Sequence, residues 1–337
     1  MAEARQRQIE AFLTGCGWGT ATRTALAGDA SARRYIRLHR AGGTAVVMDA
    51  DPARGERVDR FLQVGHWLRA QGYSAPKVLA EDVAQGLLLL EDMGDDLVAR
   101  LVSKDPGLER PLYLATTAFL ADLHRHPPPD FLAAGDARAL SALLGFVTEF
   151  YLPGMDAPVT DTALRIAPLV GDLFDRLDDG TRALSMRDFH AENLIWLPGR
   201  AGVARAGLLD FQDAFATHPA YDLVSLLQDA RRDVSLATEA ACLAAYCRQK
   251  GLEQSRFLPI YALLGAQRAL RILAIFARLS MADGKPQYLA HAPRVWAALQ
   301  RNLAHPALAD LAQAVHEGLP EPTPERLQRI RQKCPTR

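Results

Sequence analysis

Residues 185–213 read SMRDFHAENLIWLPGRAGVARAGLLDFQD, and this stretch decides the fold. In it Asp188 is followed five positions later by Asn193, and two short apolar runs joined by PGRAG then lead to a second acidic residue, Asp210. Apolar runs on either side of a segment that contains proline and glycine predict a β-hairpin. The stretch therefore predicts a hairpin flanked by two carboxylates and one carboxamide.

These three side chains have the chemistry that phosphoryl transfer requires. A carboxylate on a rigid loop can accept the proton of an acceptor hydroxyl, and this is the role we expect for Asp188. Asn193 and Asp210 offer oxygen atoms, the ligands preferred by a hard cation such as Mg²⁺. The alternative for each aspartate is an ordinary turn or strand-end residue. Agreement with the rest of the chain favours the catalytic interpretation.

The composition is that of an ordinary globular protein, with 337 residues, 49% of them hydrophobic. Basic and acidic residues balance at 39 each, so we expect no nucleic-acid partner, because such binding needs surplus positive charge. The N-terminus lacks an apolar signal-peptide core, and no apolar run approaches the roughly 18 residues of a membrane span. The four cysteines show no metal-binding spacing and should be reduced. We expect a soluble, cytoplasmic protein with no membrane partner.

The N-terminal region has the pattern of an antiparallel sheet. An opening helix is predicted at 4–15 and another helix at 56–70, where apolar residues recur with helical spacing. Alternating or apolar runs bounded by turn residues predict strands at 34–38, 45–48, 77–82 and 86–94. The Gly- and Asp-rich residues 92–96 then mark a hinge.

The remainder of the chain is mostly helical in pattern, apart from the hairpin at 194–211. Helical periodicity predicts helices at 109–125, 139–151, 162–177, 222–230, 235–250, 257–280, 288–303 and 306–317. We therefore predict an N-terminal nucleotide-binding lobe at 1–92, a C-terminal catalytic and substrate lobe at 93–320, and a frayed tail at 321–337. The pattern specifies no oligomeric state.

Several blocks of the chain resemble a known family. They are GDASARRYIRL (28–38), VVMDADP (46–52), LLLLEDMG (87–94), MRDFHAENLIWLPGR (186–200) and GLLDFQDAFATHPAYDLVSLLQDARRDV (207–234). Together they resemble aminoglycoside and choline phosphotransferases, and more closely the bacterial kinases that phosphorylate N-acetylmuramate and N-acetylglucosamine at the anomeric hydroxyl. The resemblance implies an α+β, bilobal, protein-kinase-like fold, with a small β-rich N-terminal lobe and a larger, mainly helical C-terminal lobe.

The resemblance also implies ATP and Mg²⁺, with Asp188 as catalytic base and Asn193 and Asp210 as metal ligands. The small residues of a phosphate-covering loop let backbone N–H groups approach the nucleotide, and the residues at this place are Gly28, Asp29, Ala30 and Ser31. Backbone groups of Glu91 and Met93 would bind the adenine edge. Asp222 matches the family's buried brace of the catalytic loop, although a carboxylate that opens a helix can also serve as a cap.

The chain departs from the kinase pattern in one strand. Kinases carry a lysine in their third strand that pairs with nucleotide phosphates and a helix glutamate. Here Met48 and Asp49 stand in that place. We predict that Arg34, or with less support Arg33, supplies the positive charge, since arginine forks onto phosphate oxygens. The alternative is that both are solvated strand residues.

The acceptor is predicted to be a small amino sugar. Residues beside the catalytic loop are candidates to contact it, and so are arginines that could meet a lactyl carboxylate: Arg187, His190, Glu192, Asp213 and Arg231, with Arg268 and Arg271 on a later helix. Each charged residue among them has a surface or helix-packing role as its alternative. His190 is as easily a packed loop residue.

Three functions are therefore weighed. The first is an ATP-dependent sugar kinase that produces a sugar 1-phosphate for peptidoglycan recycling and UDP-sugar synthesis. The second keeps the fold but phosphorylates another small alcohol or amine, such as an aminoglycoside or a choline-like acceptor. The third is a nucleotide-binding pseudokinase module, prompted by the absent strand lysine. The presence of Asp188, Asn193 and Asp210 favours an active enzyme.

Overall fold

The computed structural model describes residues 2–26 and 33–335, and these fall into two compact units. Unit 1 comprises the chain up to residue 104 together with residues 192–213, and unit 2 comprises residues 105–191 and 214–337. This division differs from the predicted one of 1–92 and 93–320. The reason is the hairpin of residues 194–208, which forms bridges from Gly207 to Ser74 and from Ile195 to Leu97 and so belongs with unit 1.

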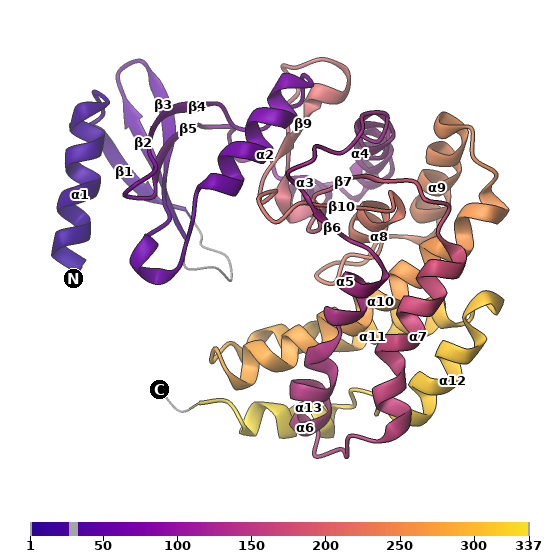
Figure 1. Ribbon diagram of the computed structural model, residues 1–337. Coiled ribbons are helices and arrows are strands. Elements are labelled where there is room, and N and C mark those ends of the chain that lie inside the picture. The colour runs from indigo at the N-terminus through magenta and orange to yellow at the C-terminus, as the bar shows by residue number, and fades with distance from the viewer. Residues whose placement is uncertain (1, 27–32, 336–337) are drawn as a thin grey trace. The chain divides into compact units, whose positions relative to one another are not determined.

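Unit 1 is built on a five-stranded antiparallel sheet (Figure 1). Its strand order is β1-β2-β3-β5-β4, with β1 at Thr22–Ala25, β2 at Arg34–Arg40, β3 at Gly43–Asp49, β4 at Val78–Asp82 and β5 at Leu87–Glu91. Helix α1 (Ala2–Gly15) covers one face, because Ile9 and Leu13 form a common core with Leu38, Val47 and Leu89. The other elements of this unit are α2 (Asp59–Ala70), α3 (Val98–Lys104), β8 (Leu194–Trp196) and β9 (Ala206–Leu208).

Helix α2 and the end of the β8–β9 hairpin pack together within unit 1. The rings of Phe61 and Phe211 stack with their centroids 4.8 Å apart. A Cβ atom at Gly65, one turn along α2, would lie 3.3 Å from the Phe211 ring, so the small residue lets the helix approach. This contact fixes the backbone next to Asp210.

Unit 2 is mainly helical. Its helices are α4 (Glu109–Leu123), α5 (Ala137–Ala142), α6 (Leu152–Gly154), α7 (Asp161–Leu177), α8 (Ala220–Leu227), α9 (Leu236–Lys250), α10 (Gln254–Met281), α11 (Ala292–Leu303), α12 (Ala309–Gly318) and α13 (Pro324–Gln332). A small sheet in the order β6-β10-β7 joins Ala133–Ala134, Phe215–Thr217 and Ala183–Ser185. In Figure 1 helix α10 runs among α8, α11 and α13, and all three contact it.

Helix α10 is the core element of unit 2. Among the described residues it is the one helix long and apolar enough to cross a membrane, but 89% of its apolar window is buried inside the structure. Burial of this kind is typical of the core helix of a globular protein. It also carries two arginines into the interior, since Arg268 and Arg271 are both buried.

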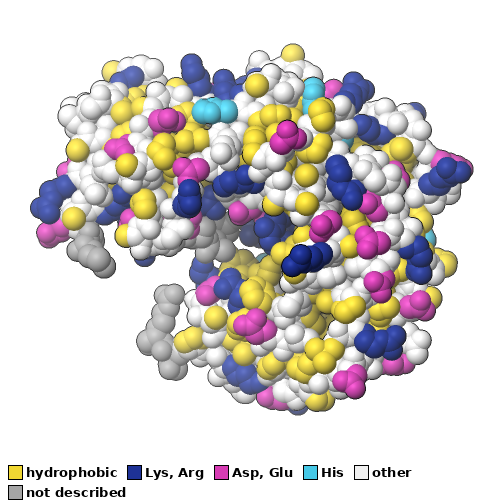
Figure 2. All heavy atoms as spheres, in the orientation of Figure 1, with side chains coloured by type: hydrophobic (Ala, Val, Ile, Leu, Met, Phe, Trp, Pro, Cys, Tyr) yellow, Lys and Arg dark blue, Asp and Glu magenta, His cyan; other side chains and the backbone are white. Residues whose placement is uncertain are grey.

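Most predicted helices and strands are present, with two local differences. The helix predicted at 139–151 is divided into α5 and a π-helical turn, η3, at Val147–Tyr151. The tail predicted to be frayed contains α13, because Leu327 and Ile330 are buried. All four cysteines are free thiols, as expected. On the face seen in Figure 2, acidic and basic side chains are interspersed, in keeping with a net charge of zero.

Candidate active site

The decisive stretch is shared between the two units. Residues 185–191 belong to unit 2 and contain Asp188, whereas residues 192–213 belong to unit 1 and contain Asn193 and Asp210. Each half is built by contacts within its own unit.

The loop that carries Asp188 has a constrained backbone. It leaves β7 at Ser185, and Arg187 has a φ of +70°. This left-handed conformation is unfavourable for a residue with a side chain, so surrounding contacts must hold it. The Arg187 carbonyl accepts hydrogen bonds from Arg268 Nη1 at 2.6 Å and from Ser225 Oγ at 3.2 Å. The stacking of Phe189 on Phe119, with centroids 5.6 Å apart, anchors the other side of the loop.

Asp222, in the first turn of α8, also holds this loop. Its Oδ1 accepts from Ser185 Oγ at 2.7 Å and from the Arg187 amide at 3.0 Å, while its Oδ2 accepts from the Met186 amide at 2.7 Å. These bonds go to the loop, as expected for a brace. Complete burial raises the pKa of Asp222 to about 6, and the three hydrogen bonds limit this rise.

Asp188 lies among positive charges. Arg268 Nη2 is 3.5 Å from Asp188 Oδ1, and the aspartate side chain is 37% exposed. Desolvation by the surrounding loop would raise the pKa of Asp188, but the guanidinium groups of Arg268 and Arg271 outweigh it and hold that pKa below its usual value. Asp188 is thus an ionised, accessible carboxylate on a rigid loop, which a general base must be.

His190 is buried beside Asp188, and its Nδ1 finds no hydrogen-bond partner within the described residues. Burial lowers the pKa of His190, while the carboxylates of Asp229 and Asp188 oppose the shift. The ring is neutral at pH 7 and has a free polar atom. Both the substrate contact and the packed loop residue remain predictions for His190.

The unit 1 half places Asn193 and Asp210 at the same end of one hairpin. Leu194 of β8 pairs with Leu208 of β9, and the Leu209 amide donates to the Asn193 carbonyl at 2.9 Å. Asp210 follows with a φ of +54°, and its Oδ1 accepts from Gln212 Nε2 at 2.8 Å. A carboxylate and a carboxamide at one strand end form a donor set that suits a hard divalent cation.

Arg33 lies beside this hairpin end. Its Nη2 is 3.8 Å from Asp210 Oδ1, and its Nε is 3.3 Å from Glu56 Oε2. The Arg33 side chain is only 9% exposed. Burial raises the pKa of neighbouring Tyr35 to about 12, with the Arg33 charge opposing the rise. Arg33 therefore pairs with both a glutamate and a candidate metal ligand.

Arg34 is differently placed. Residues in a strand alternate between faces, and Arg34 is paired directly with Asp49, which faces helix α1. Its Nε donates to Asp49 Oδ2 at 3.0 Å, while Arg5 of α1 donates to Asp49 Oδ1 from Nε at 2.9 Å and Nη2 at 2.6 Å. Arg34 is therefore bound to Asp49, whereas Arg33 lies beside Asp210.

The hinge residues are partly committed to the sheet. The Glu91 amide donates to the Lys77 carbonyl at 2.8 Å, and the Glu91 carboxylate is bound by Arg200 Nη2 at 2.5 Å and by the Lys77 amide at 3.1 Å. The Glu91 amide is therefore used within the protein, and the adenine contact through the other backbone groups of Glu91 and Met93 stays a prediction. A Cβ atom added at Gly207 would lie only 2.5 Å from the methyl carbon of Met93. Only glycine permits that approach.

The remaining predicted residues have varied surroundings. Gly28, Asp29, Ala30 and Ser31 lie outside the described residues, so the predicted phosphate loop has no structural description. Glu192 and Asp213 are exposed at the two ends of the unit 1 segment. The Arg231 amide donates to Asp229 Oδ1 at 2.8 Å, and the Arg187 side chain is half-buried.

Two residues at the site carried no clear sequence signal. Asp229 lies in a block of mixed charge, and Glu56 lies in the equally charged segment before α2. A further group of potential metal ligands in unit 2 comprises Asp178, Asp179 and His218. Asp178 is already paired with Arg182 through bonds of 2.9 and 2.7 Å, so we assign no metal there.

An ionised carboxylate on a braced loop, and an oxygen-rich strand end with an adjacent arginine, are groups that phosphoryl transfer can use. Residues 22–258 match the family described as "Phosphotransferase enzyme family", and the chain belongs to it. The predicted family is confirmed. The chain is an ATP-dependent phosphotransferase, and enzymes of this kind typically require a metal ion.

Relatives and solved structures agree with this assignment. An N-acetylmuramate/N-acetylglucosamine kinase of Caulobacter vibrioides is 40% identical over 348 aligned positions, which cover 92% of this chain and 96% of that protein. A kinase of the same name from Pseudomonas putida is 30% identical, with coverage of 92% and 93%. The crystal structure of a choline/ethanolamine kinase family protein from Mesorhizobium loti is similar with a TM-score of 0.63 at 17% identity, covering 93% of this chain and all of that one. The predicted protein-kinase-like fold is confirmed.

Proposed function

We propose that this enzyme transfers the γ-phosphoryl group of ATP to the anomeric hydroxyl of N-acetylmuramate or N-acetylglucosamine and produces the sugar 1-phosphate. The observation that carries the proposal is the 40% identity, over nearly the whole chain, with a kinase named for these two sugars. Such a product would feed UDP-sugar synthesis during peptidoglycan recycling in the cytoplasm. The remaining assignments describe how the chain's own residues would perform this transfer.

Asp188 is the proposed general base. Its lowered pKa keeps it ionised at neutral pH, and its loop is fixed by Asp222 and Arg268. A carboxylate of low pKa is a weak base in the ground state, so its main contribution is to orient the acceptor hydroxyl and to accept the proton late in the transfer. Positioning and charge neutralisation, rather than covalent catalysis, account for most of the rate.

Asn193 and Asp210 are the proposed ligands of Mg²⁺. Both present oxygen atoms at one end of the β8–β9 hairpin, and this donor set fits the ion. Asn193 and Asp210 would hold the ion, which would supply positive charge to neutralise the phosphates. Gln212 donates to Asp210 and so fixes the orientation of the carboxylate.

Arg33 is the proposed phosphate-binding cation. It takes the place of the strand lysine, and its contact with Glu56 resembles the pairing of that lysine with a helix glutamate. Gly28, Asp29, Ala30 and Ser31 directly precede this strand in the chain and would cover the phosphates with backbone N–H groups. Met93 offers backbone groups for the adenine edge.

The charge around Asp188 favours a neutral or anionic acceptor. Arg268 and Arg271 are buried near this carboxylate, and Arg231 affects the charge at neighbouring His190. A cationic aminoglycoside or choline would meet repulsion here, since such ligands need a site lined by acids. Arg187 and Arg231 are candidates to bind the lactyl carboxylate of muramate, and His190 to contact a sugar hydroxyl.

A coupled assay of nucleotide consumption tests the proposal. The purified chain would be given ATP and Mg²⁺ with N-acetylmuramate, N-acetylglucosamine, glucose, an aminoglycoside or choline, and phosphorus NMR would locate the phosphate in the product. We expect turnover with the two N-acetyl sugars and an anomeric phosphate. A 6-phosphate product, or turnover confined to the cationic acceptors, would contradict the proposal.

A further inference from the structure

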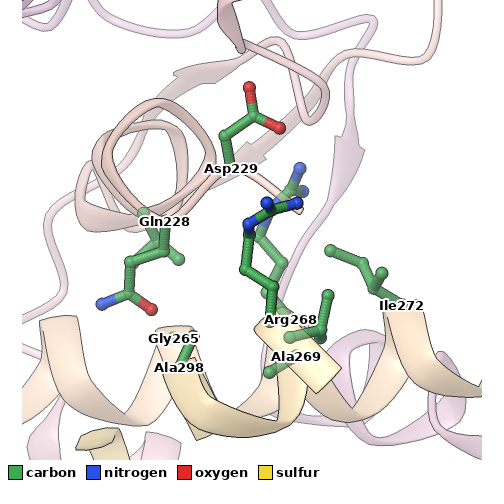
Figure 3. A pocket seen from close by; sticks show the side chains of 10 residues that line it. Gln228, Asp229, Gly265, Arg268, Ala269, Ile272 and Ala298 are labelled. Carbon is green, nitrogen blue, oxygen red and sulfur yellow. The ribbon is translucent and has the colours of Figure 1, made fainter. Parts of the chain in front are cut away.

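The pocket between α8, α10 and α11 of unit 2 is small (Figure 3). Its internal space is about 10 Å³, which is room for about one water molecule. In Figure 3 Arg268 extends from α10 toward the segment that carries Asp229. Within the described part of the chain Arg268 Nε and Asp229 Oδ2 have no hydrogen-bond partner, but a space of this size admits nothing larger than water. The pocket is therefore too small to receive part of a substrate.

In unit 1 the hinge at residues 92–96 is held to the sheet by one arginine, Arg37 of β2. Arg37 Nε lies 2.9 Å from Asp92 Oδ2, and Nη2 donates to Asp92 Oδ1 at 3.0 Å. Nη1 donates to Asp95 Oδ2 at 2.7 Å, while Nη2 also donates to the Gly94 carbonyl at 3.2 Å. Each nitrogen of the guanidinium group thus meets the hinge, and the two-pronged contact with Asp92 is a strong and directional one.

Met93 lies between the residues that Arg37 holds. Asp92 and Gly94 flank it in the chain, and the Gly94 amide donates to Asp92 Oδ1 at 3.1 Å. Gly94 has a φ of +85°, which glycine adopts without strain, so the chain can turn directly after Met93. Among the residues that the structure describes, none forms a hydrogen bond with the N–H or C=O of Met93. The hinge is therefore fixed on both sides of a peptide unit whose polar groups remain available.

Arg37 lies on the face of the sheet away from α1. The next residue, Leu38, packs into the core beneath α1, and successive residues of a strand point to opposite faces. Tyr35 shares the face of Arg37; burial raises its pKa, and the charges of Arg33 and Asp210 also act on it. One face of β2 thus has the proposed phosphate-binding groups near Tyr35 and the hinge contact at Arg37, about 7 Å further along the strand.

We propose that Arg37 is a positioning residue for the nucleotide. By holding Asp92 and Gly94 it keeps the N–H and C=O of Met93 presented to the edge of the nucleobase. The base would lie at the hinge end of β2, and the triphosphate would extend along the same face toward Arg33. This inference rests on the proposed contact between Met93 and adenine and adds the residue that orders it.

Loss of Arg37 would have two separable consequences. A hinge without this contact would have to be ordered again whenever a nucleotide binds, and ordering one or two backbone residues lowers affinity roughly 10- to 100-fold. The carboxylates of Asp92 and Asp95 would also lose their positive partner and would repel the phosphates. Positioning is the first of these effects, so its test must exclude the second.

Arg37→Ala tests the inference, with Arg40→Ala as the matched control on the same strand. Arg40 lies over the ring of Trp18, 3.8 Å from its centroid, and donates to the Gly17 carbonyl at 2.8 Å. We expect Arg37→Ala to raise KM for ATP roughly 10- to 100-fold and to leave kcat and KM for N-acetylglucosamine near their wild-type values. Arg40→Ala should change none of the three. Equal KM values for ATP in the two variants would overturn the inference.

A charge-balanced variant separates positioning from repulsion. Asp92→Asn and Asp95→Asn, added to Arg37→Ala, remove both uncompensated charges without restoring the contact that holds the hinge. We expect KM for ATP to stay raised in this triple variant. A return of KM to the wild-type value would show that Arg37 acts only by neutralising the two acids, and the inference would fail.

Conservative replacement gives a third comparison. Arg37→Lys keeps the positive charge, but one ammonium group cannot make the two-pronged contact with Asp92 and also reach Asp95. We expect KM for ATP between the values of the wild type and Arg37→Ala, with kcat unchanged. Should Arg37→Ala not fold, Arg37→Lys against Arg40→Lys decides the matter, and equal KM values for ATP would again overturn the inference.

The failure of this inference can be distinguished from that of the proposed function. Isothermal titration calorimetry with ADP and Mg²⁺ measures nucleotide affinity without any acceptor. If Arg37→Ala binds ADP as tightly as Arg40→Ala does, this inference fails whatever the acceptor is. If the wild-type enzyme phosphorylates no N-acetyl sugar, the proposed function fails, and the ADP titrations still test Arg37.

Discussion

The two parts of the 185–213 stretch use the same charged groups in opposite ways. In unit 2 the arginines Arg268 and Arg271 lie near a carboxylate, Asp188, and lower its pKa. In unit 1 two carboxylates, Glu56 and Asp210, surround an arginine, Arg33. In unit 2 the two arginines hold the carboxylate in position, and in unit 1 the two carboxylates hold the arginine in position. In each cluster the candidate functional group is the single member of its charge beside two groups of the opposite charge.

A third cluster has the same composition and a different purpose. Asp49 accepts from both Arg5 and Arg34, and its side chain is 1% exposed. Both carboxylate oxygens are used, and the cluster lies on the face of the sheet that α1 covers. An ion pair whose two carboxylate oxygens both accept hydrogen bonds, and which a helix covers, stabilises the fold. Pairing alone does not identify a site, and the face of the sheet on which a pair lies is needed as well.

The largest effect is expected when the base is removed. Asp188→Asn keeps the size of the side chain but cannot accept the proton, so kcat should fall roughly 10²- to 10⁴-fold, the usual contribution of one general base. Initial rates at saturating ATP and N-acetylglucosamine measure it, with circular dichroism to show that the fold is retained. Turnover close to that of the wild type would contradict the role of Asp188.

The assignment of the phosphate-binding cation predicts the next largest effect. Arg33→Ala should lower kcat/KM for ATP roughly 10- to 100-fold, because a charge-assisted hydrogen bond contributes about 1.5–3 kcal/mol. Arg34→Ala is the matched control at the next position. It should change this constant little, since its guanidinium group binds Asp49. Steady-state kinetics with ATP as the varied substrate make the comparison, and a larger effect at Arg34 would reverse the assignment.

The arginines around the base predict a change in pH dependence. The pKa of Asp188 is held below its usual value, so activity is present above that pKa and is lost as the pH falls through it. Arg268→Gln removes the nearest positive charge, and the acid limb of kcat should move to higher pH by roughly one unit or more. Arg268→Lys, which keeps the charge, should leave the limb near its original position.

The dependence of kcat on pH, measured for both Arg268 variants at saturating substrate, tests whether the Arg268 charge lowers the pKa of Asp188. Arg271, Arg187 and His190 also act on the Asp188 carboxylate and remain in both variants, so they cannot produce a difference between them. Coincident acid limbs for Arg268→Gln and Arg268→Lys would show that the Arg268 charge does not set the pKa of the base.

The sequence predicted those parts of the site that depend on spacing along the chain. Asp188, Asn193 and Asp210 lie around one hairpin, and the hairpin exists because two apolar runs flank a turn. The predicted fold followed from similar local patterns. The three-residue strands β7 and β10 were missed, because so short a strand has no periodicity to detect.

The parts that depend on tertiary packing were not predictable. Strand alternation predicts that successive residues from Arg34 onward point to opposite faces of the sheet, but the face that α1 covers is decided by the folded core. Likewise Asp229 and Arg268 are far apart in sequence and line one pocket only because α8 and α11 both pack against α10. In the sequence each is one charged residue among many, with no pattern to distinguish it.

The smallest effect concerns the structural cluster at Asp49 and contrasts it with both functional ones. Arg5→Ala removes two hydrogen bonds from a buried carboxylate, and we expect the free energy of unfolding to fall by about 1.5–3 kcal/mol. Arg34→Ala should cost less, about 0–1 kcal/mol, because its side chain is 58% exposed and solvent screens the pair. Urea titration followed by circular dichroism measures both, and kcat should be unchanged at a temperature where each variant is folded. Since the cluster lies on the α1 face, a loss of kcat without a loss of stability in Arg5→Ala would mean that this face takes part in catalysis, and the distinction between structural and functional ion pairs would fail.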